Sequence, residues 1–323
     1  GLVGSEMCIR DSVLKEYLIG TGGWAYFQVP GLHPLVAYSK AFNFVEVNST
    51  FYQIPSLKEV ETWRKLVPPD FQFTVRAHQT ITHKHKLQPT QEALETFEKM
   101  KQICTILNAV ILHLQTPPSF TFTQNSIDKL RDFLSSINLE GLRLALEARG
   151  VASSKLPSEL LKTMQDHNVI HCVDLSRDEM PAYESGILYS RFFGKGNHNV
   201  YQPTDEELKA IDKKASSGKF EKIILSFHFV RMYKDAARLK IYKQTGKFPR
   251  ITKSIGLSSL EEVLKEDTRF PTTKEELVRH QGWKLFDLTE EKRIHAREFL
   301  QKLQERTYEN ISDVMDALHS RIG

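Results

Sequence analysis

Eight β-rich runs alternate with helical stretches between residues 17 and 243, and this alternation restricts the fold more than any other feature. The runs lie at residues 17–23, 42–49, 71–78, 108–115, 142–149, 169–174, 186–194 and 222–229. Helix-start signals separate several of them, such as Thr90 and the capping-box spacing of Thr204 and Glu207. Eight strands that alternate with helices predict an α/β fold, a TIM-type (β/α)8 barrel. The sixth crossover, residues 175–185, is too short for a full helix.

A doubly wound open sheet is the competing α/β architecture. It requires a glycine-rich phosphate turn of the GxGxxG type directly after the first strand. The segment GTGGWAY follows the first run here, but it lacks the third glycine and the helical continuation. The barrel is therefore the better prediction.

Charged or amide side chains stand at the downstream ends of five runs. Four runs carry two of them, two residues apart, and the fifth carries one acid: Glu46 and Asn48, Arg76 and His78, His113 and Gln115, Glu147 and Arg149, and Asp174. Because side chains alternate across a strand, residues two apart share a face. In a barrel this face turns into the lumen and its C-terminal mouth, where TIM-barrel enzymes carry their active sites. The pattern therefore predicts a site at the mouth.

The composition changes near residue 250. Residues 13–249 carry the alternating pattern and form the predicted barrel, whereas residues 250–323 consist of charged amphipathic segments and predict a small all-helical domain. The second domain has 13 Lys and Arg against 14 Asp and Glu, a net charge of −1, so the rest of the chain carries +5 and the whole chain +4. Residues 1–12, GLVGSEMCIRDS, are predicted to be a non-native, adapter-derived segment.

Cysteine usage and hydropathy narrow the class of protein. The three cysteines have no CxxC spacing, and an odd number suits no disulfide framework, which favours a reducing, cytoplasmic location. No run approaches the ~20 apolar residues that span a bilayer, and no secretory signal opens the chain. We therefore expect no membrane partner.

Six motifs carry a family resemblance: GTGGWAY, VEVNSTFYQIP, FTVRAHQTITH, LHLQTPPSF, ALEAR and YSRFFGKG. With these motifs the chain resembles the YecE-like family, number 72 among the domains of unknown function. The resemblance implies a TIM-type barrel and no established reaction. In the second domain, FPTTKEEL and YENISDVMDAL resemble domain-of-unknown-function family 2795. That resemblance implies a small helical domain, and we expect it to dock an unknown protein partner.

The residue types at the predicted mouth suggest roles. Carboxyl groups and an imidazole exchange protons, so the catalytic candidates are Glu46, His78, Glu147 and Asp174. Guanidinium groups, amides, glycine turns and aromatic rings bind anions and ring faces. The ligand-binding candidates are Trp24, Tyr26, Asn48, Tyr52, Arg76, Gln115, Arg149, Arg191, Gly194, Lys195, Gly196 and His228. The competing interpretation is an ion-pair network of the acids and arginines that only fills the barrel.

A metal site is the next alternative. The histidines and acids of the mouth would suit Zn or Mn, as in barrels like xylose isomerase and endonuclease IV. The fixed charges of Arg76 and Arg149 stand in the same doublets and would repel a divalent ion. We therefore expect no metal and no cofactor.

Three functional hypotheses follow. The first is a protein that binds a phosphate-bearing sugar, nucleotide or nucleic-acid segment at the mouth, with metal-independent acid/base chemistry. Whether the chain is an enzyme stays open; as an enzyme it would be a hydrolase or lyase. The second is a non-catalytic module that binds nucleic acid or a protein partner. The third is a metal-dependent nuclease or isomerase.

Overall fold

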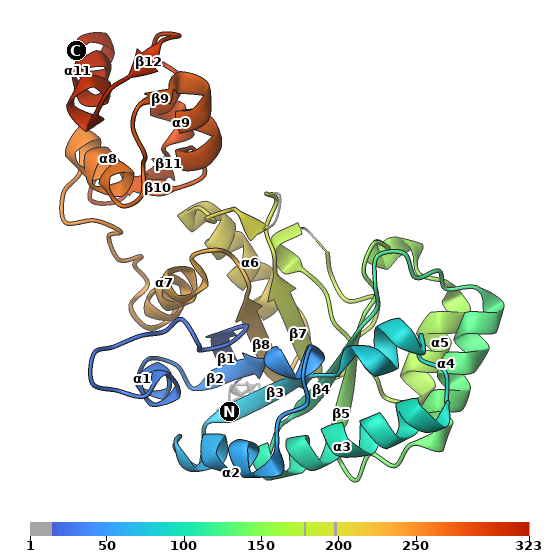
Figure 1. The fold of residues 1–323 in the computed structure, drawn as a ribbon. Coiled ribbons are helices and arrows are strands. Elements are labelled where there is room, and N and C mark those ends of the chain that lie inside the picture. Colours follow the sequence, from blue (N-terminus) through green and yellow to red (C-terminus); the bar gives the residue numbers. More distant parts are fainter. Residues whose placement is uncertain (1–14, 178, 197–198, 323) are drawn as a thin grey trace, which may run out of the picture.

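Eight parallel strands form one sheet in the order β6-β5-β4-β3-β2-β1-β8-β7. The computed structural model describes residues 15–177, 179–196 and 199–322. A bridge between Val173 and Ser190 joins the two ends of the sheet and closes it into a barrel (Figure 1). The strands are β1 (Glu16–Thr21), β2 (Phe44–Val47), β3 (Gln72–Arg76), β4 (Ile111–Gln115), β5 (Arg143–Glu147), β6 (Ile170–His171), β7 (Ile187–Phe192) and β8 (Lys222–Phe227). The predicted TIM-type barrel is confirmed.

Among the described residues, seven α-helices follow the strands of the barrel and cover the outside of the sheet (Figure 1). They are α1 (Pro34–Ala41), α2 (Leu57–Lys65), α3 (Gln91–Leu107), α4 (Gln124–Ser136), α5 (Ser158–Asp166), α6 (Asp205–Ser217) and α7 (Met232–Thr245). The predicted starts are confirmed, because the Thr90 side chain accepts from Ala93 N and Thr204 forms a capping box with Glu207. The described part of the sixth crossover holds one 3-10 turn, Leu175–Arg177, in place of a helix.

The two faces of the strands differ as the alternation of side chains predicts. Val45, Val75 and Leu112 belong to the large apolar core that includes the helices. Phe44 and Ile111 belong to a separate cluster on the inner face. Each lies two residues upstream of an inward polar residue, so the closed end of the lumen is apolar and the mouth is polar.

The second domain has its own apolar core, which includes Leu260, Phe286 and Tyr308. Its helices are α8 (Gly256–Lys265), α9 (Lys274–Gln281), α10 (Arg297–Leu300) and α11 (Ile311–Ile322). It also contains two antiparallel two-stranded sheets, which pair β10 (Leu285–Asp287) with β11 (Arg293–His295) and β12 (Thr307–Tyr308) with β9 (Thr272–Thr273).

The expected small helical domain is therefore present, but it is not all-helical. Its strands have two or three residues, too few to show a period-two pattern in the sequence. The predicted adapter-derived segment lies outside the described residues. Within the described ranges, no helix has the length and apolar character needed to cross a membrane.

Candidate functional site

The Arg191 side chain occupies the centre of the barrel mouth. Strand β7 places Tyr189 and Arg191 on the inner face, and Arg191 is only 1% exposed. Its guanidinium donates from Nε to Glu46 Oε1 and Oε2 at 3.1 and 2.9 Å, and from Nη2 to Glu46 Oε1 at 2.8 Å. On the other side Nη1 donates to Glu147 Oε2 at 2.5 Å. Arg191 therefore joins strands β2 and β5 across the lumen.

Two predicted amide side chains complete the shell around Arg191. Gln115 Oε1 accepts from Arg191 Nη1 at 2.9 Å, and Asn48 Oδ1 accepts from Nη2 at 3.3 Å. Asn48 Nδ2 also donates to the carbonyl of Gly22 at 3.0 Å. A side chain at Gly22 would put its Cβ 2.2 Å from His228 Cε1, so this glycine makes room for the shell.

The charges of the mouth fix the ionisation of its two central acids. Burial alone would raise the pKa of the Glu46 carboxyl, but the nearby charges, Arg191 first, hold that pKa well below its usual range. The same holds for Glu147, where burial is again outweighed by Arg191 and its neighbours. Both acids are therefore carboxylates at neutral pH.

The two buried histidines of the mouth carry no charge at neutral pH. Burial and the charge of Arg191 lower the pKa of His113 to about 4. The same two causes lower the pKa of His228. His228 Nε2 lies 3.5 Å from Glu46 Oε1 and 3.1 Å from Ser226 Oγ.

Arg76 has a different environment. Its guanidinium carbon lies 3.7 Å from the centre of the Phe51 ring. Its Nε is buried without a hydrogen-bond partner, and among the described residues its side chain makes no ion pair. Burial and the repulsion from Arg191 lower the pKa of Arg76 to about 10, so it stays protonated at neutral pH. Arg76 is therefore a half-buried cation with no carboxylate partner among the described residues.

Arg149 extends the positive edge of the mouth. Its Nε donates to Glu147 Oε1 at 2.9 Å, and its guanidinium lies 4.4 Å from the centre of the Phe193 ring. Phe193 also stacks on His228, at 4.7 Å between ring centres. Burial lowers the pKa of His83, and the charges of Arg76 and Arg149 lower it further.

A cleft of about 470 Å³ opens beside Glu147 and Arg149. Asp174, Phe193 and Asn199 form part of its wall. Asp174 accepts from the amides of Ser176 and Phe193 at 2.9 and 3.0 Å, so it ties the loop after β6 to the loop after β7. Burial raises the pKa of Asp174. The volume of the cleft suits a small molecule.

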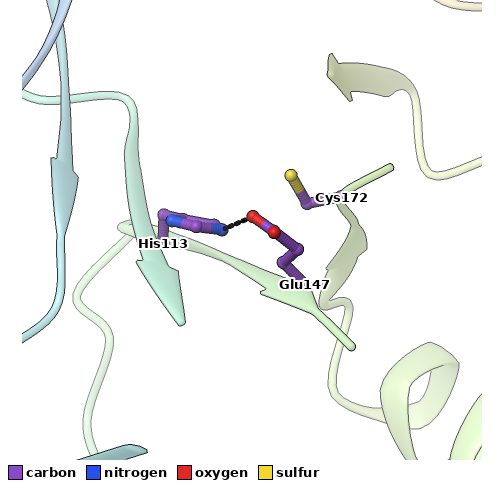
Figure 2. A group of neighbouring side chains, drawn as sticks. All are labelled: His113, Glu147 and Cys172. Carbon is purple, nitrogen blue, oxygen red and sulfur yellow. Dashed lines mark ion pairs between the residues drawn. The ribbon is translucent and has the colours of Figure 1, made fainter. Parts of the chain in front are cut away.

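Figure 2 shows His113, Glu147 and Cys172, whose nitrogen, oxygen and sulfur atoms lie within 4.8 Å of one another. Such a set has the donor chemistry of a zinc site. Glu147 already pairs with two guanidinium groups, however, and burial keeps the Cys172 thiol protonated by raising its pKa. A divalent ion would have to displace or repel Arg191, so the residues present do not fit a metal well.

The remaining predicted residues lie away from this cluster. His78 accepts through Nδ1 from Thr80 N at 3.2 Å within its own loop. Trp24 packs against Trp63, whereas Tyr26 and Tyr52 are exposed on the loops after β1 and β2. These aromatic residues do not touch Arg191 or the two central acids.

The expected phosphate loop after β7 is engaged elsewhere. The Gly194 amide donates to Ser176 Oγ at 3.1 Å, and its carbonyl accepts from Arg177 Nε at 2.8 Å. Lys195 pairs with Glu207 on α6 at 3.2 Å. Gly196 lies against Val200, whose carbonyl would be 2.2 Å from an added Cβ. The backbone groups of Gly194 and the Lys195 side chain thus have partners within the protein.

Three residues of the cluster were given no role from the sequence, although His113 was predicted to face the mouth: Tyr189, Phe193 and His113. Tyr189 donates to Glu46 Oε2, and Phe193 contacts Arg149 and His228. All three share the inward parity of Arg191 or Gln115. Extending that parity along the strands to aromatic residues would have identified them.

These features define a TIM-type barrel whose mouth is closed by a central arginine and two carboxylates. The chain belongs to the family described as "Protein of unknown function DUF72", whose sequence model matches residues 18–243. The second resemblance, for residues 270–318, stays an expectation.

Two relatives support this assignment. The chain is 32% identical over 182 residues to UPF0759 protein YunF of Bacillus subtilis (strain 168), covering 52% of this chain and 64% of YunF. It is 29% identical over 108 residues to UPF0759 protein YecE of Escherichia coli (strain K12), covering 33% of this chain and 38% of YecE. The matched part is thus less than two thirds of either relative.

Two solved structures show the same fold. A DUF72 family protein from Thermotoga maritima superposes with a TM-score of 0.57 at 21% identity, covering 71% of this chain and 99% of that one. A DUF72 family protein from Enterococcus faecalis gives 0.56 at 18% identity, covering 72% and 98%. Both comparisons concern the fold alone.

Proposed function

We propose that the barrel mouth binds a phosphate-bearing ligand whose anionic group lies between Arg76 and Arg149. The observation that carries this proposal is Arg76, a half-buried guanidinium with no carboxylate partner among the described residues. A buried charge without a partner is costly, so such a group is retained where something else supplies the opposite charge.

The charge balance of the mouth supports an anion. Two carboxylates, Glu46 and Glu147, face three guanidinium groups, Arg76, Arg149 and Arg191. The buried histidines are neutral, so these five groups have a net charge of +1; Asp174, Arg177 and Glu179 of the cleft wall lie outside this count. Arg191 is saturated by protein acceptors, which leaves Arg76 and the outer part of Arg149 for a ligand.

The chemistry of these groups favours phosphate. A guanidinium group offers a planar fork of donors that matches phosphate oxygens in two-pronged contacts. Tyr52 is 69% exposed and follows Phe51, on which Arg76 stacks. We propose that this tyrosine covers the sugar or base that carries the phosphate. We therefore propose a sugar phosphate, a nucleotide or a nucleic-acid segment as the ligand.

The pKa directions favour binding over proton exchange. Glu46 and Glu147 are held as carboxylates by the arginines, which makes them weak bases at neutral pH. Asp174 has a raised pKa, but its oxygens accept hydrogen bonds from Ser176 and Phe193. We propose a binding role for the mouth and assign no residue to a hydrolase or lyase step.

Isothermal titration with inorganic phosphate, ribose 5-phosphate and AMP tests this proposal. We expect Arg76→Met and Arg149→Met to weaken binding at least about tenfold, as for the loss of a charged hydrogen bond. Arg131→Met, which removes a 40% exposed guanidinium on α4, is the matched control and should bind like the wild type. Equal affinity of wild type and Arg76→Met for each of these probes would overturn the proposal.

A single-stranded oligonucleotide titrated at several salt concentrations separates the ligand classes. A steep loss of affinity with salt for the oligonucleotide, together with weak binding of AMP, would assign the mouth to nucleic acid. Tighter binding of ribose 5-phosphate or AMP with a shallow salt dependence would assign it to a small molecule.

A further inference from the structure

The barrel and the second domain meet through a polar interface. Each domain has a separate apolar core. Between them lies a buried network in which Asp205 of α6 accepts from Arg238 Nη2 at 2.6 Å and from Arg293 Nη1 at 2.9 Å. Arg293, on β11, also donates from Nε to Asp287 on β10 at 3.0 Å. Asp205, Arg238 and Arg293 are each at most 5% exposed.

Gln202 of the barrel also bonds to the second domain. Its side chain is fully buried, donates from Nε2 to Asp235 of α7 at 3.2 Å, and accepts through Oε1 from the amide of Leu285 on β10 at 2.9 Å. Its backbone carbonyl lies 2.8 Å from His295 Nε2 on β11. The side chain and the backbone carbonyl of Gln202 thus contact both α7 and the second domain. A buried polar network of this kind fixes one relative orientation of its parts.

The segment that Gln202 anchors leads directly to the mouth. The neighbouring Tyr201 packs on His295, with ring centres 5.7 Å apart. Tyr201 also covers Gly194, where an added Cβ would lie 2.9 Å from Tyr201 Cβ. Gly194 follows Phe193, which contacts Arg149 and stacks on His228. Contacts thus run without a break from the second domain to the wall of the cleft.

We infer that Gln202 is a positioning residue through which the second domain holds Phe193, and with it the β7 side of the mouth, in place. The upstream end of this loop is held by the barrel, because Asp174 accepts from the Phe193 amide. The downstream end is held by Gln202, which is hydrogen-bonded to Leu285 and His295 of the second domain. The second domain therefore shapes the cleft although it contributes no residue to it.

Two variants of the full chain test this inference. Gln202→Leu keeps the volume of the side chain but removes its two side-chain hydrogen bonds, those with Asp235 and with the Leu285 amide. His295→Ala removes the partner of the Gln202 carbonyl and the ring behind Tyr201, and it is the milder change if Gln202→Leu folds poorly. The matched control is Arg250→Ala, which breaks the exposed Arg250–Glu290 ion pair outside the buried network.

Hydrogen exchange read by mass spectrometry is the first measurement. We expect amides in residues 192–196 and 199–205 to exchange roughly tenfold faster in both variants, because opening of these segments no longer breaks the buried hydrogen bonds. Exchange in β2 and β4 should stay as in the wild type, and the control should match the wild type throughout. Unchanged exchange in residues 192–196 and 199–205 in both variants would overturn the inference, whether or not β10 and β11 exchange faster.

Phosphate affinity is the second measurement, and this part rests on the proposed function. We expect both variants to bind inorganic phosphate several-fold more weakly than the control. If the wild type itself binds no phosphate, the proposed function fails and the exchange result alone decides the positioning role. If the loop loosens and phosphate affinity stays the same, the second domain does not shape the anion site.

Discussion

Replacing Glu46 by glutamine should destabilise the barrel more than any other change of a single hydrogen-bonding atom in the mouth. Glu46 is fully buried and receives three contacts from Arg191 as well as the Tyr189 hydroxyl. In Glu46→Gln, one oxygen becomes an NH2 group that faces donors on Arg191 or Tyr189. The substitution also leaves Glu147 as the one carboxylate among the described residues that pairs with Arg191, and Glu147 pairs with Arg149 as well.

The size of the effect follows from this geometry. Breaking a buried ion pair by removing one partner costs about 3–5 kcal/mol, because the remaining charge stays buried and uncompensated. A domain of ordinary stability has about 5–15 kcal/mol in total. The Glu46→Gln variant should therefore fold but lose a large part of its resistance to denaturant.

Equilibrium urea unfolding followed by far-ultraviolet circular dichroism measures this loss. Glu92→Gln is the control, since it removes a carboxylate from the exposed pair with Lys84 and should leave the barrel midpoint unchanged. A Glu46→Gln midpoint equal to that of the wild type would refute the reasoning that Arg191 depends on Glu46 for its charge balance.

Three further predictions concern the same mouth. The folded-state pKa values of Glu46 and Glu147 lie well below the usual 4.5, so their stabilisation is fully present above that pH and is lost as the pH falls through the lowered values. Urea midpoints measured from neutral pH down to about pH 3 should fall less steeply for Glu46→Gln than for the wild type. Gly22→Ala puts a Cβ 2.2 Å from His228 Cε1, and because that ring stacks on Phe193 the variant should lose about 1–3 kcal/mol in urea unfolding. Elemental analysis of protein purified without chelator should find less than one zinc per chain, since Arg191 already neutralises Glu147; a full equivalent that is lost in Cys172→Ser would contradict this.

The sequence predicts the barrel and its inner face because both depend on short-range periodicity. The count of eight β-rich runs holds, and alternation places Glu46, Gln115 and Glu147 on one face with Arg191. This parity is a property of each strand by itself, so no tertiary information is needed to obtain it.

The pairing of the charges depends on distances between strands and could not be predicted. The sequence does not indicate that Arg191 pairs with both Glu46 and Glu147, or that Arg76 has no carboxylate partner among the described residues. Lys195 illustrates the same limit, because its partner Glu207 comes near only through the turn into α6. The buried contacts of Gln202 with the second domain likewise join residues 83 and 93 positions apart, without any local signal.

The most direct measurement is a crystal soaked in tungstate, a phosphate-shaped anion that scatters strongly enough to be located without ambiguity. The account predicts one strong peak within hydrogen-bonding reach of the guanidinium groups of both Arg76 and Arg149, outside the shell that encloses Arg191. An empty mouth at a saturating tungstate concentration, or a peak only beside Lys195 and Gly196, would contradict it.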